Sequence, residues 1–286
     1  MPSPSEDAQP KIAVDVSDRR AYDEALRDFY HPHYHDEKRA TTRRAAERIL
    51  PIVISIVDVT SIIDVGCGPG SWLDVARELG VPTVTGVEGE WAAEWFDDDR
   101  LRSGGFDLVL ANLEDELRPA ATFDLALCIE VIEHLSPARG ESFVADLCRC
   151  AGHVLFGAAI PGQKGPNHLN TRWPSYWAEC FAAHGYLPLD VVRARVWGDD
   201  DLLVHHRQNP LLFVREDLYD RTVGRALEMA PPPLAALDRV HPAVYARRSK
   251  ERPRLDAPGL RLRVRLAAGI PRAVVRRLRG ASDRER

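Results

Sequence analysis

Residues 61–70, with the sequence Ser-Ile-Ile-Asp-Val-Gly-Cys-Gly-Pro-Gly, restrict the possible folds of this chain more than any other segment. An apolar run of strand length ends in a glycine-rich loop, and a helical pattern begins at Ser71. Glycines let the backbone approach a ligand closely, and the first N–H groups of a helix attract polar ligand groups. The segment therefore predicts the first strand, loop and helix of a nucleotide-binding α/β domain.

The chain beyond this segment alternates short apolar runs with helical patterns, which is typical of stacked β-α-β units and a mostly parallel sheet. The predicted strands are residues 61–65, 83–87, 108–111, 125–129 and 153–158. The predicted helices are residues 71–79, 91–95, 137–150 and 174–184. Two later extended segments, residues 187–196 and 211–214, are expected to add an antiparallel hairpin. We therefore predict a doubly wound, mostly parallel seven-stranded α/β sheet.

The remaining segments are expected to flank this core. Residues 1–17 lack periodicity and are predicted to form a flexible N-terminus, and residues 18–55 a helical cap. Within the cap we expect helices over residues 18–30 and 39–50, separated by an irregular segment around Pro32. The main domain is predicted over residues 56–230. A proline-containing basic appendage is predicted over residues 231–286, beginning at three consecutive prolines.

Charge is unevenly distributed along the chain. Residues 247–286 hold 14 Lys or Arg and 4 Asp or Glu, a balance of +10, so the net charge of −5 leaves −15 for the rest. Such an acidic body argues against nucleic acid as a partner, because affinity for nucleic acids depends largely on neutralising phosphates. The basic tail has three interpretations: an anchor to a membrane surface or anionic polymer, a partner-binding arm, or a solvated segment on the acidic body.

Composition points to a globular protein of the cytoplasm. No apolar run approaches the length of a membrane span, and the polar, acidic start of the chain does not resemble a secretory signal. The five cysteines are an odd number, and we expect them to be reduced and structural. The sequence leaves the oligomeric state open, with a homodimer as one arrangement.

The spacing of residues within and after the glycine loop limits the class of ligand that the loop can bind. A dinucleotide fingerprint requires glycine at position 71, where this chain has Ser71, so the loop suits an adenosyl amino acid without a pyrophosphate. Asp64 is placed to orient the ligand's ammonium group. Glu88 ends the second predicted strand, where its carboxylate can accept both ribose hydroxyls or remain an ordinary surface carboxylate. Asn112 follows the third strand, and its amide oxygen can accept a hydrogen bond from adenine.

These features resemble successive motifs of class I S-adenosylmethionine-dependent methyltransferases. The resemblance rests on residues 64–70, Glu88 and residues 123–135, and it extends over residues 61–186. It implies a Rossmann-like methyltransferase fold and S-adenosyl-L-methionine as the cofactor. The cofactor-binding residues that it implies are Asp64, Gly66, Cys67, Gly68, Pro69, Gly70, Trp72, Glu88, Gly89, Asn112, Leu113 and Glu130.

A second, more specific resemblance indicates which kind of molecule accepts the methyl group. Residues 158–163, 168–170, 173–177 and 207–209 are similar to a bacterial group of small methyltransferases that is often associated with polysaccharide and natural-product pathways. The resemblance implies transfer to a hydroxyl group of a small molecule, namely a saccharide or natural-product intermediate. Trp173, Tyr176 and Trp177 could offer an aromatic surface to such an acceptor, but we expect the tryptophans to pack in the core.

The fourth predicted strand leads into the motif Glu130-Val-Ile-Glu133-His134, whose three titratable side chains can converge on one point. With an imidazole and a second carboxylate so close, each carboxylate is costly to ionise, because the two like charges repel. A divalent cation would remove this cost. The motif is similar to that of metal-dependent methyltransferases acting on the terminal 2′-hydroxyl of small RNAs, in which another histidine lies downstream. His168 occupies a comparable place. The resemblance thus implies a Mg²⁺ or Mn²⁺ site formed by Glu130, Glu133, His134 and His168.

Several alternatives stay open at this stage. Many methyltransferases without a metal carry Glu-His at this position, where Glu133 would contact ligand or backbone and His134 would act as general base. Such an enzyme would methylate an oxygen or a nitrogen of a small molecule. Under either mechanism we predict Glu133 and His134 to be the catalytic residues. A metal-dependent RNA 2′-O-methyltransferase would reuse the same side chains, although the acidic body argues against it. A protein that only binds the cofactor would need the glycine loop but not the acidic-histidine cluster.

Overall fold

The structure of the protein is a computed structural model. It describes residues 21, 24–25, 32–96, 105–165, 167–226 and 237–244, with the backbone alone for residues 32–38 and 94–95. The predicted flexible N-terminus (residues 1–17) lies outside the described residues, as do most of the predicted helix 18–30 and most of the predicted appendage 231–286. The elements below belong to one compact unit, Met1–His241. No described helix is both long and apolar enough to cross a membrane.

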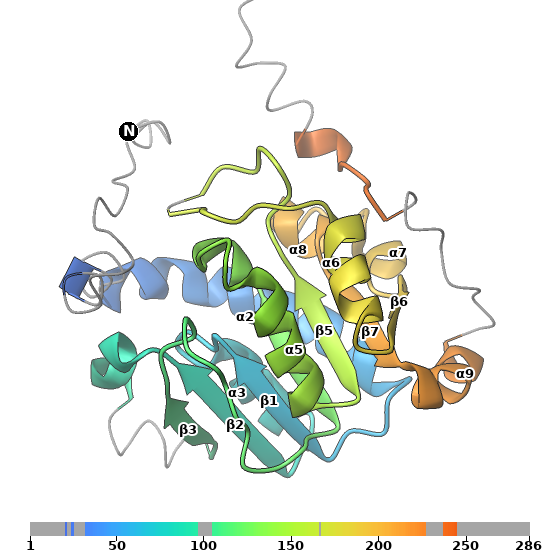
Figure 1. Cartoon of the computed structure of the whole chain (residues 1–286), viewed down its shortest axis with the longest axis horizontal. Coiled ribbons are helices and arrows are strands. Elements are labelled where there is room, and N and C mark those ends of the chain that lie inside the picture. Colours follow the sequence, from blue (N-terminus) through green and yellow to red (C-terminus); the bar gives the residue numbers. More distant parts are fainter. Residues whose placement is uncertain are drawn as a thin grey trace, which may run out of the picture. The chain divides into compact units, whose positions relative to one another are not determined.

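The centre of this unit is a seven-stranded sheet with the strand order β3-β2-β1-β4-β5-β7-β6 (Figure 1). Five neighbouring strands pair in parallel, and β7 runs antiparallel to both β5 and β6. The strands are β1 Ser61–Val65, β2 Thr83–Glu88, β3 Asp107–Leu110, β4 Leu125–Ile129, β5 His153–Gly157, β6 Tyr186–Leu189 and β7 Leu211–Arg215. The predicted Rossmann-like fold of class I methyltransferases is confirmed.

Helices cover both faces of the sheet, with α5 on one face and α2 and α3 on the other (Figure 1). The helices are α2 Pro32–Ile54, α3 Ser71–Glu78, α5 Gly140–Cys150, α6 Pro174–Ala182, α7 Arg193–Val196, α8 Val204–Gln208 and α9 Glu216–Arg225. Two short 3-10 helices, η2 Glu90–Trp95 and η3 Ile132–His134, follow β2 and β4.

Alternating side chains along the strands build two hydrophobic cores, because successive residues of a strand point to opposite faces of the sheet. On β4, Leu125 and Leu127 pack toward α2 and α3, whereas Ala126 and Cys128 pack toward α5 and α6. The α2 side also receives a fully buried helical stripe from the predicted cap, formed by Ala45, Ala46, Ile49, Leu50 and Val53. All five cysteines are free thiols, as predicted.

The prediction of an irregular segment around Pro32 is wrong. Helix α2 begins at Pro32 and continues past Pro51 to Ile54. Proline is tolerated in the first turn of a helix, because the N–H that it lacks would have no partner there. Pro51 is exposed in the last turn, so only one hydrogen bond near the helix end is lost. A helix also starts later than predicted on the other face, since α5 begins at Gly140 rather than residue 137.

The predicted extended segment 187–196 is only partly correct. Strand β6 ends at Leu189, and the chain turns into α7 at Arg193. The buried Arg193 guanidinium donates two hydrogen bonds, of 2.9 and 2.6 Å, to the Asp190 carboxylate three residues earlier. A turn brings residues three apart together and a strand does not, so this buried ion pair requires the chain to leave the sheet. Arg193 also donates to the carbonyl of Leu237 at 2.8 Å.

The strand order places the functional motifs at one edge of the sheet. Strand β1 lies between β2 and β4, so the connections after β1 and β4 leave toward opposite faces and a crevice opens between them. The glycine loop after β1, Glu88 at the end of β2 and Glu130 after β4 all belong to this carboxyl edge. This is the edge at which open α/β sheets bind their ligands.

Candidate functional site

The glycine loop is fixed by its backbone. The N–H groups of Gly66 and Cys67 donate to the carbonyl of Val87, at 2.8 and 3.1 Å. Gly66 has a φ of +81°, and a β-carbon added there would lie 2.5 Å from a methyl group of Val131 in the segment after β4. A side chain at this position would therefore require both a strained backbone and a movement of the neighbouring segment.

Glu88 is tied to the loop by both of its carboxylate oxygens. They accept hydrogen bonds from the N–H of Gly68, at 2.7 Å, and from the N–H of Gly89, at 2.9 Å. Burial raises the pKa of Glu88, while these two backbone donors act against that rise. Each oxygen retains the capacity to accept another hydrogen bond, as the predicted contact with two ribose hydroxyls requires.

Two buried polar atoms beside the loop lack a hydrogen-bond partner within the protein. Asp64 is 2% exposed, and its Oδ2 has no partner; nor does the buried Oγ of Ser71 at the start of α3. Burial, together with the charge of Glu88, raises the pKa of Asp64 to about 8. Buried polar groups are normally satisfied, so these atoms fit a ligand that brings hydrogen-bond donors or a positive charge. An adenosyl amino acid carries such an ammonium group.

Other residues of the predicted cofactor set occupy different environments. Gly70 adopts a φ of +80° and donates to the Cys67 carbonyl at 3.0 Å, which closes the turn that contains Pro69, directly before α3. Trp72 is 4% exposed and belongs to the hydrophobic core on the α2 side. The indole therefore packs within this core, and its contact with the cofactor stays a prediction.

Hydrogen bonds attach the segment after β3 to the residues that connect η3 with α5. The Oδ1 of Asn112 accepts a hydrogen bond from the N–H of Glu114 at 2.9 Å, and the carbonyl of Leu113 accepts one from Arg139 at 2.9 Å. The Glu114 carboxylate in turn accepts hydrogen bonds from the N–H and hydroxyl of Ser136, at 2.6 and 2.8 Å. Asn112 thus stabilises its own turn, and one lone pair of its oxygen remains for the predicted adenine contact.

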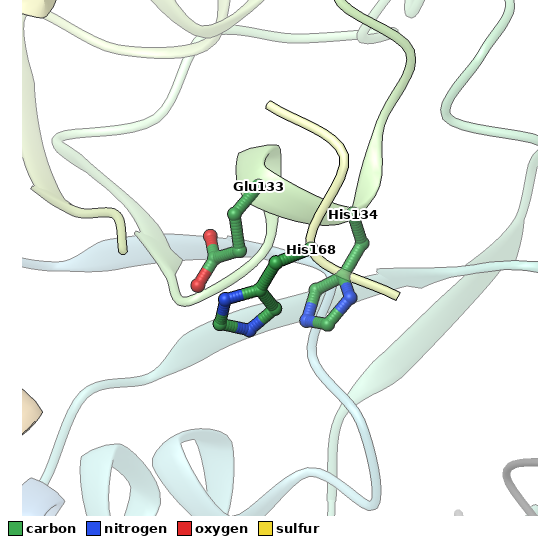
Figure 2. Close-up of side chains that lie close together, drawn as sticks. All are labelled: Glu133, His134 and His168. Carbon is green, nitrogen blue, oxygen red and sulfur yellow. The ribbon is translucent and has the colours of Figure 1, made fainter. Parts of the chain in front are cut away.

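Glu133, His134 and His168 form a compact cluster. Glu133 and His134 belong to η3, directly after β4, and His168 lies in the connection between β5 and α6. Each offers one ligand atom, and these atoms all lie within 4.8 Å of one another. The three side chains project to the same side of η3, with the imidazoles next to each other (Figure 2). Their rings meet edge to face, with centroids 5.0 Å apart.

Main-chain hydrogen bonds bring the two parts of this cluster together. The carbonyl of Glu133 accepts from the N–H groups of Leu169 and Asn170, at 2.7 and 3.0 Å. The Nδ1 of His168 lies 3.1 Å from the carbonyl oxygen of Gln163. A carbonyl can only accept, so Nδ1 carries the hydrogen and Nε2 is the basic nitrogen of His168. Such a contact is typical of histidines that orient one nitrogen toward a metal or a proton donor.

Glu133 is fully buried, and neither carboxylate oxygen makes a hydrogen bond of normal geometry. Burial raises its pKa well above the ordinary value, and the nearby charge of Glu130 adds to that rise. The backbone N–H groups of Glu133 and Ala159 act against this rise, but less strongly than burial causes it. A buried carboxylate with so little hydrogen bonding is costly unless a cation or a proton neutralises it. Two imidazole nitrogens and this carboxylate are a mixed N and O donor set that suits Mn²⁺ and related divalent ions.

Glu130, predicted as the fourth ligand, is not one of the three residues in this cluster. Its carboxylate instead accepts hydrogen bonds from the side-chain amides of Asn209, at 2.6 Å, and Gln163, at 2.8 Å. Sequence reasoning did not assign a role to either amide. Asn209 lies 79 residues from Glu130, in the turn before β7, and no local pattern connects the two.

The aromatic residues of α6 behave differently from one another. Trp177 is 1% exposed and packs against Phe156, with ring centroids 5.8 Å apart, so the prediction that it lies in the core is confirmed. Trp173 is 39% exposed, because it precedes the helix and does not share the buried face of Trp177. For Trp173 the prediction of core packing is wrong.

Comparison with known proteins identifies the family. The sequence pattern of the methyltransferase domain family matches residues 31–187, more than half of the chain. This chain belongs to that family. It is an S-adenosylmethionine-dependent methyltransferase, and S-adenosyl-L-methionine is the cofactor of the family. No curated protein sequence matches the chain.

Solved structures are similar to this chain at low sequence identity, and the first two named here share its fold. The magnesium protoporphyrin IX methyltransferase of Synechocystis, with bound S-adenosylhomocysteine, is 12% identical, with 67% of this chain and 99% of that chain covered and a TM-score of 0.50. A putative O-methyltransferase of Nostoc punctiforme is 13% identical, with 73% and 66% covered and a TM-score of 0.50. An O-methyltransferase family protein of Burkholderia thailandensis is 12% identical, with a TM-score of 0.46; the match covers 71% of this chain and 61% of that protein.

Proposed function

We propose that this methyltransferase transfers the methyl group of S-adenosyl-L-methionine to a hydroxyl group of a small molecule, a saccharide or natural-product intermediate, with the help of a divalent cation. The observation that carries the proposal is the cluster of Glu133, His134 and His168, in which a fully buried carboxylate without regular hydrogen bonds faces two imidazoles. A protein that only bound the cofactor would have no use for such a costly group.

Residues of the glycine loop and of β2 are the ones that would hold the methyl donor. Asp64 provides a buried carboxylate for the ammonium group, and Glu88 provides two oxygens for the ribose. The donor supplies an electrophilic methyl group on a sulfonium. Gly66 lets Val131 pack directly against the loop, so the loop and the segment after β4 lie next to each other.

Residues of the acidic-histidine cluster are the ones that would prepare the acceptor. Glu133, His134 and the Nε2 of His168 can hold one divalent ion, which would lower the pKa of a hydroxyl group. In a mechanism without metal, His134 accepts the hydroxyl proton as the oxygen–carbon bond forms and the carbon–sulfur bond breaks. In both mechanisms the chain contributes by holding the acceptor oxygen in line with the methyl group.

The first experiment measures methyl transfer and metal binding separately. Isothermal titration with MnCl₂ is expected to show one site on the wild-type protein and none on the Glu133→Gln variant. His168→Gln is expected to weaken Mn²⁺ binding, whereas His184→Gln, which changes an exposed histidine outside the cluster, is the matched control. Wild-type binding of Mn²⁺ that persists in Glu133→Gln would contradict the assignment of the site.

The second experiment tests activity. Transfer of a labelled methyl group is measured on a panel of saccharides, phenols and a short RNA, before and after treatment with EDTA. We expect activity on a small hydroxylated acceptor that disappears with EDTA and returns with Mg²⁺ or Mn²⁺. Full activity after chelation would support His134 as a general base without metal. Transfer to the RNA alone would instead identify an RNA 2′-O-methyltransferase.

A further inference from the structure

Glu130 occupies an unusual position at the end of β4. It is one of two described non-glycine residues with a positive φ, at +58°. Such a conformation costs about 1 kcal/mol or more for a residue with a β-carbon and persists only where surrounding contacts enforce it. The Glu130 N–H donates to the Gly157 carbonyl at 2.8 Å, and its carboxylate accepts one amide hydrogen bond on each oxygen, from Asn209 and from Gln163. We call Glu130, Gln163 and Asn209 the Glu130 triad.

Asn209 is the buried support of the triad. It is 3% exposed, and its Nδ2 donates both to Glu130, at 2.6 Å, and to the side-chain oxygen of Gln163, at 3.1 Å. Its Oδ1 accepts from the amide of Gln208 at 3.0 Å, and the Oε1 of Gln208 accepts from the N–H of His241 at 2.7 Å. All the hydrogen-bonding groups of the Asn209 amide are thus directed at the protein, and the opposite amide orientation would point an oxygen at the carboxylate.

The other two members of the triad keep unused capacity. Glu130 and Gln163 are both partly exposed. Each oxygen of Glu130 accepts one amide hydrogen and can accept another, and the Nε2 of Gln163 donates one of its two hydrogens to Glu130. The open side of the triad therefore presents a charged acceptor next to a neutral donor, held in fixed positions by Asn209.

The Glu130 triad adjoins the cluster of Glu133, His134 and His168. Gln163 belongs to both, because its main-chain carbonyl orients His168 while its side-chain amide binds Glu130. Glu130 lies close enough to Glu133 for its charge, and a side-chain hydrogen bond between the two carboxyl groups, to raise the pKa of Glu133. A molecule that places one atom at the cluster can therefore contact the triad with a neighbouring group.

We propose that Glu130 and Gln163, supported by Asn209, bind two adjacent hydroxyl groups of the acceptor, so that the enzyme requires a vicinal diol such as that of a sugar ring. One hydroxyl donates to the carboxylate, and its neighbour accepts from the Gln163 amide. The inference rests on the proposed function and narrows its acceptor. A polar site of this kind selects strongly, because an acceptor without the hydroxyl leaves the carboxylate and the amide without a partner.

Binding measurements separate the triad from the cofactor and metal sites. We compare the wild-type protein with Gln163→Met and Asn209→Leu, which keep the shape of each side chain and remove its amide. Both variants are expected to bind S-adenosylhomocysteine and Mn²⁺ with the wild-type dissociation constants. A loss of affinity for S-adenosylhomocysteine would assign the triad to the cofactor site, and a loss for Mn²⁺ would restore Glu130 as a metal ligand; either result would overturn the inference.

Kinetic measurements test the acceptor. The probes are methyl glucoside, methyl mannoside and methyl rhamnoside, each with its monodeoxy forms. We expect Gln163→Met and removal of the adjacent hydroxyl each to lower kcat/KM about 10- to 100-fold through KM, and the two changes together to cost no more than one alone. Additive losses, or equal transfer to deoxy probes, would overturn the inference.

A control and a further outcome complete the test. Tyr186→Phe removes a buried hydroxyl that bonds to the carbonyls of Cys148 and Ala151, so it is expected to lower thermal stability without changing the preference for diols. Wild-type protein that binds S-adenosylhomocysteine but methylates none of the diol probes would overturn this inference alone. Absence of S-adenosylhomocysteine binding would overturn the proposed function as well.

Discussion

Two halves of the sheet edge are built by different means. The half proposed to bind the cofactor, here called the cofactor half, comprises residues 64–72, 88–89 and 112–113. It uses backbone groups and carboxylates that are close in sequence; Gly68 and Glu88, for example, are 20 residues apart. The half proposed to bind the acceptor, here called the acceptor half, comprises residues 130–134, 163–170 and 209. It depends on side chains from separate segments, with Asn209 79 residues from Glu130. We therefore expect changes in one half to leave the other intact. The predictions run from changes within the two halves to a change outside both.

The largest effect is expected in the acceptor half. Glu133→Gln removes the charge of a fully buried carboxyl while keeping its size. We expect kcat to fall on the order of 10³-fold, since loss of a catalytic acid–base or metal-binding group has effects of that size. Titration with S-adenosylhomocysteine should give the wild-type dissociation constant. If the variant also loses this ligand, the two halves are not independent.

Gly66→Ala is the corresponding change in the cofactor half. The new β-carbon would meet Val131 at 2.5 Å in a backbone with a φ of +81°, so affinity for S-adenosylhomocysteine should fall about 10- to 100-fold. Gly80→Ala is a matched control: Gly80 has a φ of +88° but open space around it, so the substitution adds backbone strain alone. Equal affinities of the two variants in calorimetric titration would remove the steric explanation.

Asp64 should link cofactor binding to pH. Its pKa of about 8 without ligand means that it is mostly protonated at pH 7, and an ammonium group beside it would favour the ionised form. Binding of S-adenosylhomocysteine should therefore release a proton below pH 8, and affinity should rise with pH up to about 8. Calorimetry in buffers of different ionisation enthalpy measures this release. An Asp64→Asn variant that still releases the proton would disprove the assignment.

The smallest effect concerns a residue outside both halves. His153, at the start of β5, is hydrogen-bonded to the Asp124 carbonyl at 3.1 Å and to the Thr222 hydroxyl at 3.0 Å. Burial lowers its pKa, so below pH 6.5 the unfolded chain binds the proton more readily than the folded one. Stability should be lost as the pH falls from about 6.5 through the folded-state pKa.

Urea unfolding between pH 7.5 and 5.5 measures that loss. The free energy of unfolding of His153→Gln should depend less on pH than that of the wild-type protein, by about 1 kcal/mol or less. Methyl transfer and S-adenosylhomocysteine binding at pH 7.5 should be unchanged. A pH dependence identical to that of the wild-type protein would show that His153 contributes nothing to acid sensitivity.

The difference between residues close in sequence and residues from distant segments also explains what the sequence could predict. Local patterns located β1 and β4 to the residue, because a buried strand in a parallel sheet reads as a short apolar run. They also placed Glu88 at the end of β2. The role of Asn209 could not be predicted, since it exists only because β7 brings the turn before it beside β4 and β5.

The errors have a physical cause as well. The apolar, β-branched residues after Leu189 suggested a longer strand, but a buried ion pair between Asp190 and Arg193 outweighs that propensity. The prediction of Glu130 as a metal ligand, which followed its spacing from Glu133, stays a prediction. Spacing alone gave no indication of the amides of Gln163 and Asn209, which take up its carboxylate.

The connection between β5 and α6 carries much of the acceptor half. It provides Gln163 and His168, exposes Leu169 and Trp173, and is attached to η3 through the carbonyl of Glu133. Not one of the residues proposed to bind the methyl donor lies in it. If the proposed roles hold, a descendant of this enzyme could change what it methylates by altering this one connection, while inheriting its use of S-adenosylmethionine unchanged.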